Sequence, residues 1–436
     1  MVVAVVRLAS FGGHRFIVEF CGTGIRVADS TSLSFERLEK GKMVMYARLR
    51  SRFGLVFVGA LALLLVTPAI AMPANDSTDA QTVTDVEFLG EVVIPTGTEF
   101  QGTEIGGLSS ITFDAGRRVY HTLSDDQGNR PTGDPVRYYT VDIDFADGTL
   151  DDGDVTFVDV TELFEDKKQP FPPGGLDPEG FTLGRQGFFF MSSEGNPLAS
   201  PIIDPFIRRY NHNGRVTADL PIPAKYIPNG VDWGVRFNLS FESLNPTPDG
   251  RTLVTAGEGA LLQDGPASTF TNGSLARLLE YDLRKRTPRA EYAYEVAPWA
   301  EPSSIFGVNG IVEVLPIDDA GTMLVMERSF SVGGTQGGGT GNVVVINEVS
   351  TRDATDVLGI DALYEGGAPI AFTPVSQRQV FAFDDLGIPI DNIEGMTFGP
   401  TLPDGRRSLV IVSDNNFSTG QFTQFIVLAV DIDSVG

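Results

Sequence analysis

Short apolar runs separated by polar breaks recur along most of the chain, and residues 176–195 show the pattern most clearly. An acidic segment with Asp177 and Glu179 leads into a first apolar run, a polar break spans 184–187, and a second apolar run ends at Glu194. This order predicts a β-hairpin with acidic residues at the start of its first strand and the end of its second. Because antiparallel strands run in opposite directions, both acidic positions are expected at the same end of the hairpin.

The same pattern occurs four more times along the chain. The other copies open near Gly106, Glu242, Asn309 and Glu394 and end at Asp125, Glu258, Glu327 and Asp414. Further apolar runs between the hairpins, such as 136–141 and 275–281, are expected third strands, each with a fourth strand after it. Repeated four-stranded units are typical blades. The sequence therefore predicts an all-β fold, a β-propeller of four-stranded blades with five visible repeats, and leaves open a sixth within 347–390.

One apolar run stands alone ahead of the first hairpin, at residues 86–95. In a ring of blades, such a strand completes the last blade and joins the two ends of the chain without leaving an open sheet edge. Its expected partner is the last apolar run, residues 425–430.

The first 85 residues differ from the repeats. Residues 1–42 are interpreted as an upstream extension that is not native, and arginines followed by an apolar run and a final Ala-x-Ala predict a signal peptide over 43–71. A retained membrane anchor is the alternative, although the apolar run is short for a span. Residues 72–85 are expected to form a flexible lead-in and 86–436 the propeller domain. The expected location is therefore secreted or periplasmic.

Composition narrows the classes of function. A formal net charge of −25 argues against nucleic acid as a partner and favours cations or substrates presented with cations, unless the acidic surface only keeps the protein soluble. With Cys21 as the only cysteine and three histidines in all, neither a disulfide within the chain nor a His-rich centre is expected. The absence of a Gly-x-Ser-x-Gly motif argues against a Ser-His-Asp hydrolase.

Several motifs in order resemble one known family. They are Gly106-Gly107-Leu108-Ser109, Asp177-Pro178-Glu179-Gly180, Ser193-Glu194-Gly195, Glu327-Arg328-Ser329-Phe330, Asp353-Ala354-Thr355-Asp356-Val357, Asn392-Ile393-Glu394-Gly395-Met396 and Ser413-Asp414-Asn415-Asn416-Phe417. Together they resemble the phytase-like family, whose members are called "esterase-like activity of phytase" proteins. The resemblance covers roughly residues 86–432 and implies a secreted or periplasmic β-propeller. By analogy, it also implies the calcium-dependent phosphatase chemistry of β-propeller phytases, which have acidic central channels.

The ends of the hairpins supply the candidate site. Because the first strand of each blade lines the channel, the acidic positions are expected to converge around one mouth, with Glu242 among them. The predicted metal ligands are Glu179, Glu194, Glu258, Glu394, Asp125 and Asp414. Clustered carboxylates repel one another unless cations lie among them, and Ca²⁺ prefers oxygen ligands. The competing interpretation is that these carboxylates only accept backbone hydrogen bonds from neighbouring blades.

The predicted catalytic residues are Glu194, Glu327 and Arg328. A guanidinium in an acidic ring binds phosphate or carboxylate groups, or else simply pairs with a neighbouring carboxylate. The expected function is a metal-assisted phosphoester or ester hydrolase, monomeric, with Ca²⁺ as the cofactor and a small-molecule substrate, phosphorylated compounds included. No nucleic-acid partner and no membrane attachment after signal removal are expected. The alternative is a propeller without enzymatic activity that binds a ligand or another protein.

Overall fold

The computed structural model describes five strands within residues 8–46, and residues 80–435 except 167–168. The chain divides into two compact units, residues 1–70 and 71–436. The strands of the first unit are β1 (Leu8–Phe11), β2 (His14–Cys21), β3 (Gly24–Asp29), β4 (Ser34–Leu38) and β5 (Lys42–Tyr46). Residues 47–79, which contain most of the expected signal peptide and lead-in, lie outside the described residues, so those assignments stay predictions.

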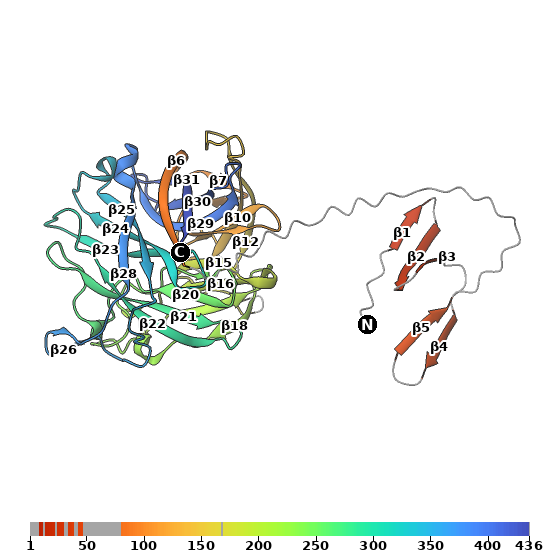
Figure 1. The fold of residues 1–436 in the computed structure, drawn as a ribbon, viewed down its shortest axis with the longest axis horizontal. Coiled ribbons are helices and arrows are strands. Elements are labelled where there is room, and N and C mark those ends of the chain that lie inside the picture. The colour runs from red at the N-terminus through yellow and green to blue at the C-terminus, as the bar shows by residue number, and fades with distance from the viewer. Residues whose placement is uncertain are drawn as a thin grey trace, which may run out of the picture. The chain divides into compact units, whose positions relative to one another are not determined.

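The second unit contains five four-stranded antiparallel sheets that form the five blades of a β-propeller (Figure 1). Blade 1 is β9 (Leu108–Asp114), β10 (Val119–Ser124), β11 (Arg137–Ile143) and β12 (Val155–Glu162), and blade 2 is β15 (Pro178–Leu183), β16 (Phe189–Ser193), β17 (Phe206–Tyr210) and β18 (Val216–Leu220). Blade 3 is β19 (Asn245–Pro246), β20 (Thr252–Ala256), β21 (Ser274–Asp282) and β22 (Thr287–Val296). The predicted fold class is therefore confirmed.

The last two blades differ in how the chain supplies their outer strands. Blade 4 is β23 (Gly307–Pro316), β24 (Thr322–Ser331), β25 (Asn342–Ser350) and β28 (Ser376–Ala382), and blade 5 is β29 (Asn392–Thr401), β30 (Arg407–Asp414), β31 (Phe422–Ser434) and β6 (Gln81–Pro95). Because β28 pairs with β25, the stretch 347–390 belongs to blade 4. The ring has five blades, and the open alternative of a sixth is removed.

The connections add only short elements. They are β7 (Glu99–Phe100), β8 (Thr103–Glu104), β13 (Phe164–Asp166), β14 (Gln169–Pro170), β26 (Tyr364–Glu365) and β27 (Ala368–Pro369), with 3-10 turns η1 (Arg185–Gly187), η2 (Ala224–Tyr226), η3 (Leu262–Asp264), η4 (Gly337–Gly339) and η5 (Phe383–Leu386). Among the described residues, no helix combines the length and the apolar character that a membrane span requires.

The first and last strands of the propeller close the ring. Strand β6 pairs antiparallel with β31, from Pro95 opposite Phe422 to Gln81 opposite Ser434, and Figure 1 shows the orange β6 beside the blue β31. The predicted pairing of the lone strand with the last run is confirmed, although β6 starts at Gln81 rather than Val86. Because β6 covers the edge of β31, that strand is not left unpaired where the two ends of the propeller meet.

The core lies between neighbouring blades, where the apolar faces of adjacent sheets meet. One buried cluster joins blades 4 and 5 and includes Met326, Ile346 and Ile411, while a second joins blades 5 and 1 through Phe425 and Leu108. Alternate residues of a strand point to opposite faces of its sheet, so each blade offers apolar side chains to both neighbours. This packing fixes the blades against each other and positions the residues at their inner ends.

Each innermost strand carries one more residue than its partner near the same end, which is a β-bulge. The extra residue falls at Ser109 in blade 1, within 179–180 in blade 2, within 242–244 in blade 3, at Val312 in blade 4 and at Glu394 in blade 5. A bulge redirects a side chain and locally ends regular pairing. The five bulges therefore set which side chains reach the centre of the ring.

Candidate metal and catalytic site

The second strand of every blade ends at the same level of the ring. The backbone N–H of Asp125 donates to Gly107 O at 2.7 Å, that of Glu194 to Asp177 O at 2.9 Å and that of Glu258 to Ser240 O at 2.7 Å, while Arg328 pairs with Gly310 and Asp414 with Asn392. Five equivalent positions thus carry four carboxylates and one guanidinium. We call this end of the propeller the acidic mouth.

The bulged segments add three more carboxylates, Glu179, Glu242 and Glu394. Carboxylate oxygens come within 4.8 Å of one another in two groups, Asp177 with Glu179 and Glu194, and Glu194 with Glu242 and Glu258. Glu194 belongs to both groups. An arrangement of oxygen donors at this spacing can hold a hard divalent cation.

Burial raises the pKa of most carboxyl groups at the acidic mouth, and the charges of the neighbouring carboxylates raise them further. The pKa is about 6 for Asp177 and about 7 for Glu258, and for Asp414 it is about 8. The pKa is raised well above its usual range for the half-buried Asp125 and Glu179 and for the buried Glu194 and Glu242. Mutual repulsion of this kind is relieved by protons or by a bound cation.

Arg328 of blade 4 lies among these carboxylates and contacts residues of blades 3 and 5. Its Nη1 donates to Glu394 Oε1 at 2.7 Å and also to Asn392 Oδ1, and its Nη2 lies 3.5 Å from Glu258 Oε1. Asn392 Nδ2 in turn donates to Glu394 Oε1 at 2.8 Å and to Asp414 Oδ2 at 3.3 Å. Burial alone would lower the pKa of Arg328, but the charges of Glu394 and Glu258 outweigh it and raise the pKa.

The buried polar atoms that lack a hydrogen-bond partner among the described residues include Asp125 Oδ1 and Arg328 Nε, both at the acidic mouth. A Cβ built on Gly107 would lie 1.9 Å from Asp125 Oδ1, so the close approach of strand β9 to this carboxylate requires glycine. Buried polar atoms are nearly always satisfied in folded proteins. An unsatisfied carboxylate oxygen inside an acidic cluster fits a site that takes a cation.

A cavity of about 1230 Å³ opens onto the acidic mouth. Glu258, Arg328 and Glu394 line its charged part, and Ile305 and Phe306, which are 78% and 54% exposed, line an apolar part. Gly338 and Gly339 of the glycine-rich loop 333–339 also line this cavity. A ligand entering here meets charged groups on one side and apolar side chains on the other.

Glu327, predicted as a catalytic residue, lies apart from this cluster. It accepts hydrogen bonds from Tyr294 Oη at 2.5 Å, Ala297 N at 3.0 Å, Asn309 Nδ2 at 2.7 Å and Asn347 Nδ2 at 3.2 Å. Since successive side chains of a strand point to opposite faces, the presence of Arg328 at the mouth directs Glu327 away from it. The expectation that Glu327 converges with the other carboxylates is wrong, and its hydrogen bonds match a structural role.

The other expected residues do converge. The residues that lie at the acidic mouth are Glu179, Glu194, Glu258, Glu394, Asp125, Asp414 and Arg328. The charges of neighbouring carboxylates are among the causes that raise the pKa of the shifted carboxyl groups. Sequence reasoning overlooked Asp177 as a ligand, although it stands two residues before Glu179 and immediately ahead of strand β15. It also overlooked Asn392, which bridges Arg328 and Asp414.

Five blades around a buried ring of carboxylates define a β-propeller with an acidic channel mouth. The family model described as "Phytase-like: Esterase-like activity of phytase" matches residues 103–417. The chain belongs to this phytase-like family. The matched residues include all the carboxylates of the mouth.

A curated relative and two solved structures are also similar to this chain. An "Uncharacterized secreted protein" of Arthroderma benhamiae is 27% identical over 192 residues, which are 36% of this chain and 35% of that protein, so the match spans about a third of the relative. A periplasmic gluconolactonase of Pseudomonas aeruginosa has 12% identity and a TM-score of 0.33, with 77% of this chain and 90% of that chain covered. The Dos1 propeller has 9% identity and a TM-score of 0.30, with 79% and 78% covered.

Proposed function

We propose that this protein is a hydrolase that uses a divalent cation, Ca²⁺ in the first place, to cleave a phosphoester or ester at the acidic mouth. One observation carries the proposal: a buried set of carboxylates, one with an unpartnered oxygen, surrounds a guanidinium beside an open cavity. Family membership supports hydrolysis as the class of reaction.

The proposed ligands are Asp177, Glu179, Glu194 and Glu242, whose oxygens already lie at ligand spacing. Asp125 Oδ1 provides a further oxygen at the same mouth. When bound, such an ion polarises a phosphoryl or carbonyl oxygen as a Lewis acid. Glu194 is proposed as the ligand that both groups share. Ser240 N–H donates to its Oε1 and fixes its orientation.

Arg328 is proposed to bind an anionic oxygen of the substrate. Glu394 holds one edge of the guanidinium at 2.7 Å, whereas the contact with Glu258 is longer, at 3.5 Å. The longer contact with Glu258 is the weaker one, so a substrate oxygen can replace it at a smaller loss of free energy. A planar guanidinium binds phosphate or carboxylate groups through paired N–H donors.

Glu258 is proposed as the group that moves a proton during the reaction. It lines the cavity, and its pKa of about 7, raised by burial and by Glu394 against the opposing effect of Arg328, leaves it half protonated near neutral pH. General acid–base catalysis is most effective when the pKa lies near the working pH. Carboxylates that do not line this cavity, such as Glu179, are assigned to the cation instead.

Hydrolysis of p-nitrophenyl phosphate, p-nitrophenyl acetate and phytate by EDTA-treated protein, with and without millimolar Ca²⁺, tests the proposal. We expect Ca²⁺-dependent hydrolysis of at least one substrate, reduced by about 10²-fold or more in Glu258→Gln. Glu99 is exposed and does not line the cavity, so Glu99→Gln is the matched control. Absence of hydrolysis together with absence of Ca²⁺ binding would overturn the proposal.

A second candidate function is a propeller that binds a ligand without transforming it. The adjacent exposed side chains of Ile305 and Phe306 beside the charged groups favour it, because contiguous exposed apolar patches often mark ligand-binding sites. Ca²⁺ binding without hydrolysis of any of the three substrates would place this candidate first.

We also propose that the protein is exported as a monomer and that its mature N-terminus is Met72. The order of arginines, apolar run and Ala-x-Ala before residue 72 supports export, as does the name of the Arthroderma benhamiae relative. N-terminal sequencing of exported protein tests the cleavage site, and a chain that begins well before residue 60 contradicts it. Size-exclusion chromatography with light scattering tests the monomer.

A further inference from the structure

The hairpin turns of blades 2 and 3 form a second cavity at the end of the strands opposite the acidic mouth. Strands β15 and β19 run from the mouth to turns at 184–188 and 247–251, and strand β21 ends at the neighbouring turn 283–286. These turns and strand β17 enclose a cavity of about 580 Å³. The length of the blade strands separates this cavity from the candidate hydrolase site at the acidic mouth.

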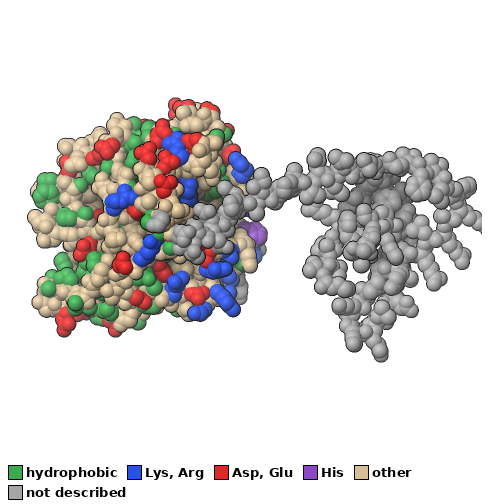
Figure 2. Space-filling model, in the orientation of Figure 1, with side chains coloured by type: hydrophobic (Ala, Val, Ile, Leu, Met, Phe, Trp, Pro, Cys, Tyr) green, Lys and Arg blue, Asp and Glu red, His purple; other side chains and the backbone are tan. Residues whose placement is uncertain are grey.

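Arginines dominate the lining of this cavity, which we call the arginine cavity. They are Arg185, Arg209, Arg251, Arg284 and Arg289, against a single lining carboxylate, Asp282. The concentration runs against the composition, since the chain has 57 acidic and 32 basic residues. Figure 2 shows Lys and Arg side chains gathered on the surface where Figure 1 labels β15, β16 and β20.

The nearby carboxylates are engaged in the turns themselves, and Asp249 Oδ2 also lies 3.3 Å from Arg251 Nη1. Asp282 Oδ1 accepts the backbone N–H groups of Arg284 and Lys285, both at 2.9 Å, and its Oδ2 lies 3.4 Å from Lys285 Nζ. The side chain of Arg284 has no hydrogen-bond or ion-pair partner among the described residues. Arg289 donates to Thr252 Oγ1 at 2.8 Å, a neutral acceptor, and lies 3.4 Å from Glu280. The cavity therefore holds more cationic than anionic charge.

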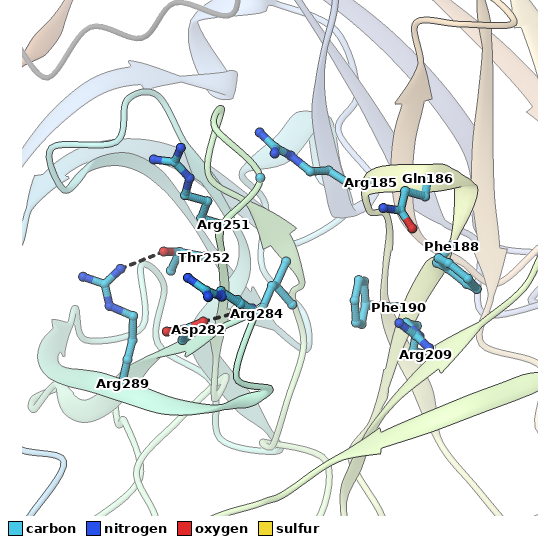
Figure 3. A pocket seen from close by; sticks show the side chains of 12 residues that line it. Arg185, Gln186, Phe188, Phe190, Arg209, Arg251, Thr252, Asp282, Arg284 and Arg289 are labelled. Carbon is cyan, nitrogen blue, oxygen red and sulfur yellow. Dashed lines mark hydrogen bonds between the residues drawn. The ribbon is translucent and has the colours of Figure 1, made fainter. Parts of the chain in front are cut away.

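Aromatic rings form one wall of the arginine cavity, as Figure 3 shows for Phe188 and Phe190. The Arg209 guanidinium lies 4.3 Å from the Phe188 ring centroid and donates to Thr217 Oγ1 at 2.9 Å, so packing and hydrogen bonding hold it in place. Burial, followed by repulsion from Arg286, lowers the pKa of Arg209. The fold thus holds like charges together without enough counter-charge, and a bound anion would relieve the repulsion.

We propose that the arginine cavity binds a ligand that carries several oxyanion groups, either linked phosphates or the sulfates of a sugar. A volume of about 580 Å³ exceeds the need of a single phosphate, and five guanidiniums spread over three turns and two strands match several oxyanions spaced along one ligand. Arginine binds such groups through paired N–H donors. The proposal does not depend on the activity assigned to the acidic mouth.

Isothermal titration calorimetry on the full chain, stripped of cations and kept in cation-free buffer at low salt, tests the proposal. The probes are tripolyphosphate, a fully sulfated disaccharide and inorganic phosphate. We expect at least one of the first two to bind far more tightly than inorganic phosphate, and the probe that binds identifies the source of the oxyanions. Binding should weaken steeply as salt is added, because exposed charges are screened.

Variants locate the binding. Arg284→Ala is expected to weaken binding about tenfold, which corresponds to about 1.4 kcal/mol, and Arg251→Ala combined with Arg284→Ala should weaken it further. Both residues are exposed in turns, so unchanged melting temperatures should show that the variants fold. Arg117, an exposed arginine in the β9–β10 turn of blade 1, provides the matched control Arg117→Ala. Failure of both oligoanions to bind, or binding that the cavity variants leave unchanged, would overturn the proposal.

Discussion

The guanidinium of Arg328 on blade 4 donates from Nη1 to Oε1 of Glu394 on blade 5 at a distance of 2.7 Å, and both side chains are nearly buried. Arg328 is the only one of the five equivalent strand ends that is cationic. Its charge offsets part of the repulsion among carboxylates that converge from the other four blades. The pair therefore connects two blades and also sets how much negative charge remains for a bound cation.

Replacement of Arg328 by methionine should lower the free energy of unfolding by about 3–5 kcal/mol at neutral pH, because it leaves Glu394 and Glu258 buried without their cation. Millimolar Ca²⁺ should restore part of this loss by taking the place of the guanidinium charge. Urea denaturation with and without Ca²⁺ measures both effects. Arg117→Met, at an exposed pair with Asp114, is the control and should change stability by less than about 0.5 kcal/mol.

The variants Glu194→Gln and Glu327→Gln should separate a cation ligand from a structural carboxylate. Glu327 has four hydrogen-bond donors around it, so an amide in its place meets donors with its own NH₂ and should cost about 1–3 kcal/mol of stability. Its Ca²⁺-induced rise in melting temperature should persist. In Glu194→Gln that rise should be lost, and a rise equal to that of the parent protein would argue against Glu194 as a ligand.

Without a bound cation, stability should fall as the pH rises from about 4 to about 8. Carboxyl groups of an unfolded chain titrate near pH 4, whereas the pKa in the folded chain is about 7 for Glu258 and about 8 for Asp414. The folded chain therefore binds more protons than the unfolded chain in this window, and the free energy of unfolding decreases with pH. Urea denaturation across the window, in EDTA and in Ca²⁺, measures the slope, and Ca²⁺ should flatten it by competing with protons.

Gly107→Ala should disturb the acidic mouth more than a glycine replacement elsewhere. Its φ of +62° disfavours any side chain, and the new Cβ would lie 1.9 Å from Asp125 Oδ1. Gly133 has a φ of +73° with nothing within 4 Å of a Cβ, so Gly133→Ala measures the backbone cost alone, about 1–2 kcal/mol. The excess loss in Gly107→Ala, from paired thermal melts, reports the clash with Asp125. Equal losses would contradict the close approach.

The convergence of carboxylates could be predicted from the sequence because it follows from strand polarity. An acidic residue before one apolar run and another after the next, as with Glu179 and Glu194, lie at one end of any antiparallel hairpin. The blade-4 hairpin shows the limit of this reasoning. Its sequence offers both Glu327 and Arg328, and a shift of register by one residue reverses which of them faces the mouth.

The bulges and the arginine cavity could not be predicted in the same way. The bulge positions Ser109 and Val312 share no residue type with Glu394, because a bulge depends on how two strands pair and not on one local motif. Likewise, each arginine of the cavity stands in a separate turn or strand, where it resembles an ordinary solvated residue. Only the packing of blade 2 against blade 3 brings Arg209 and Arg284 to one cavity.

The pairing of β6 with β31 determines when the ring can be completed during synthesis. Strand β6 is made before every other propeller strand, but its partner is the last strand to leave the ribosome. Until then, the edge of β6 has no blade to join, and a nascent chain cannot reach the closed form. A propeller built in this way gains its protection from edge-to-edge aggregation only after β31 has been made.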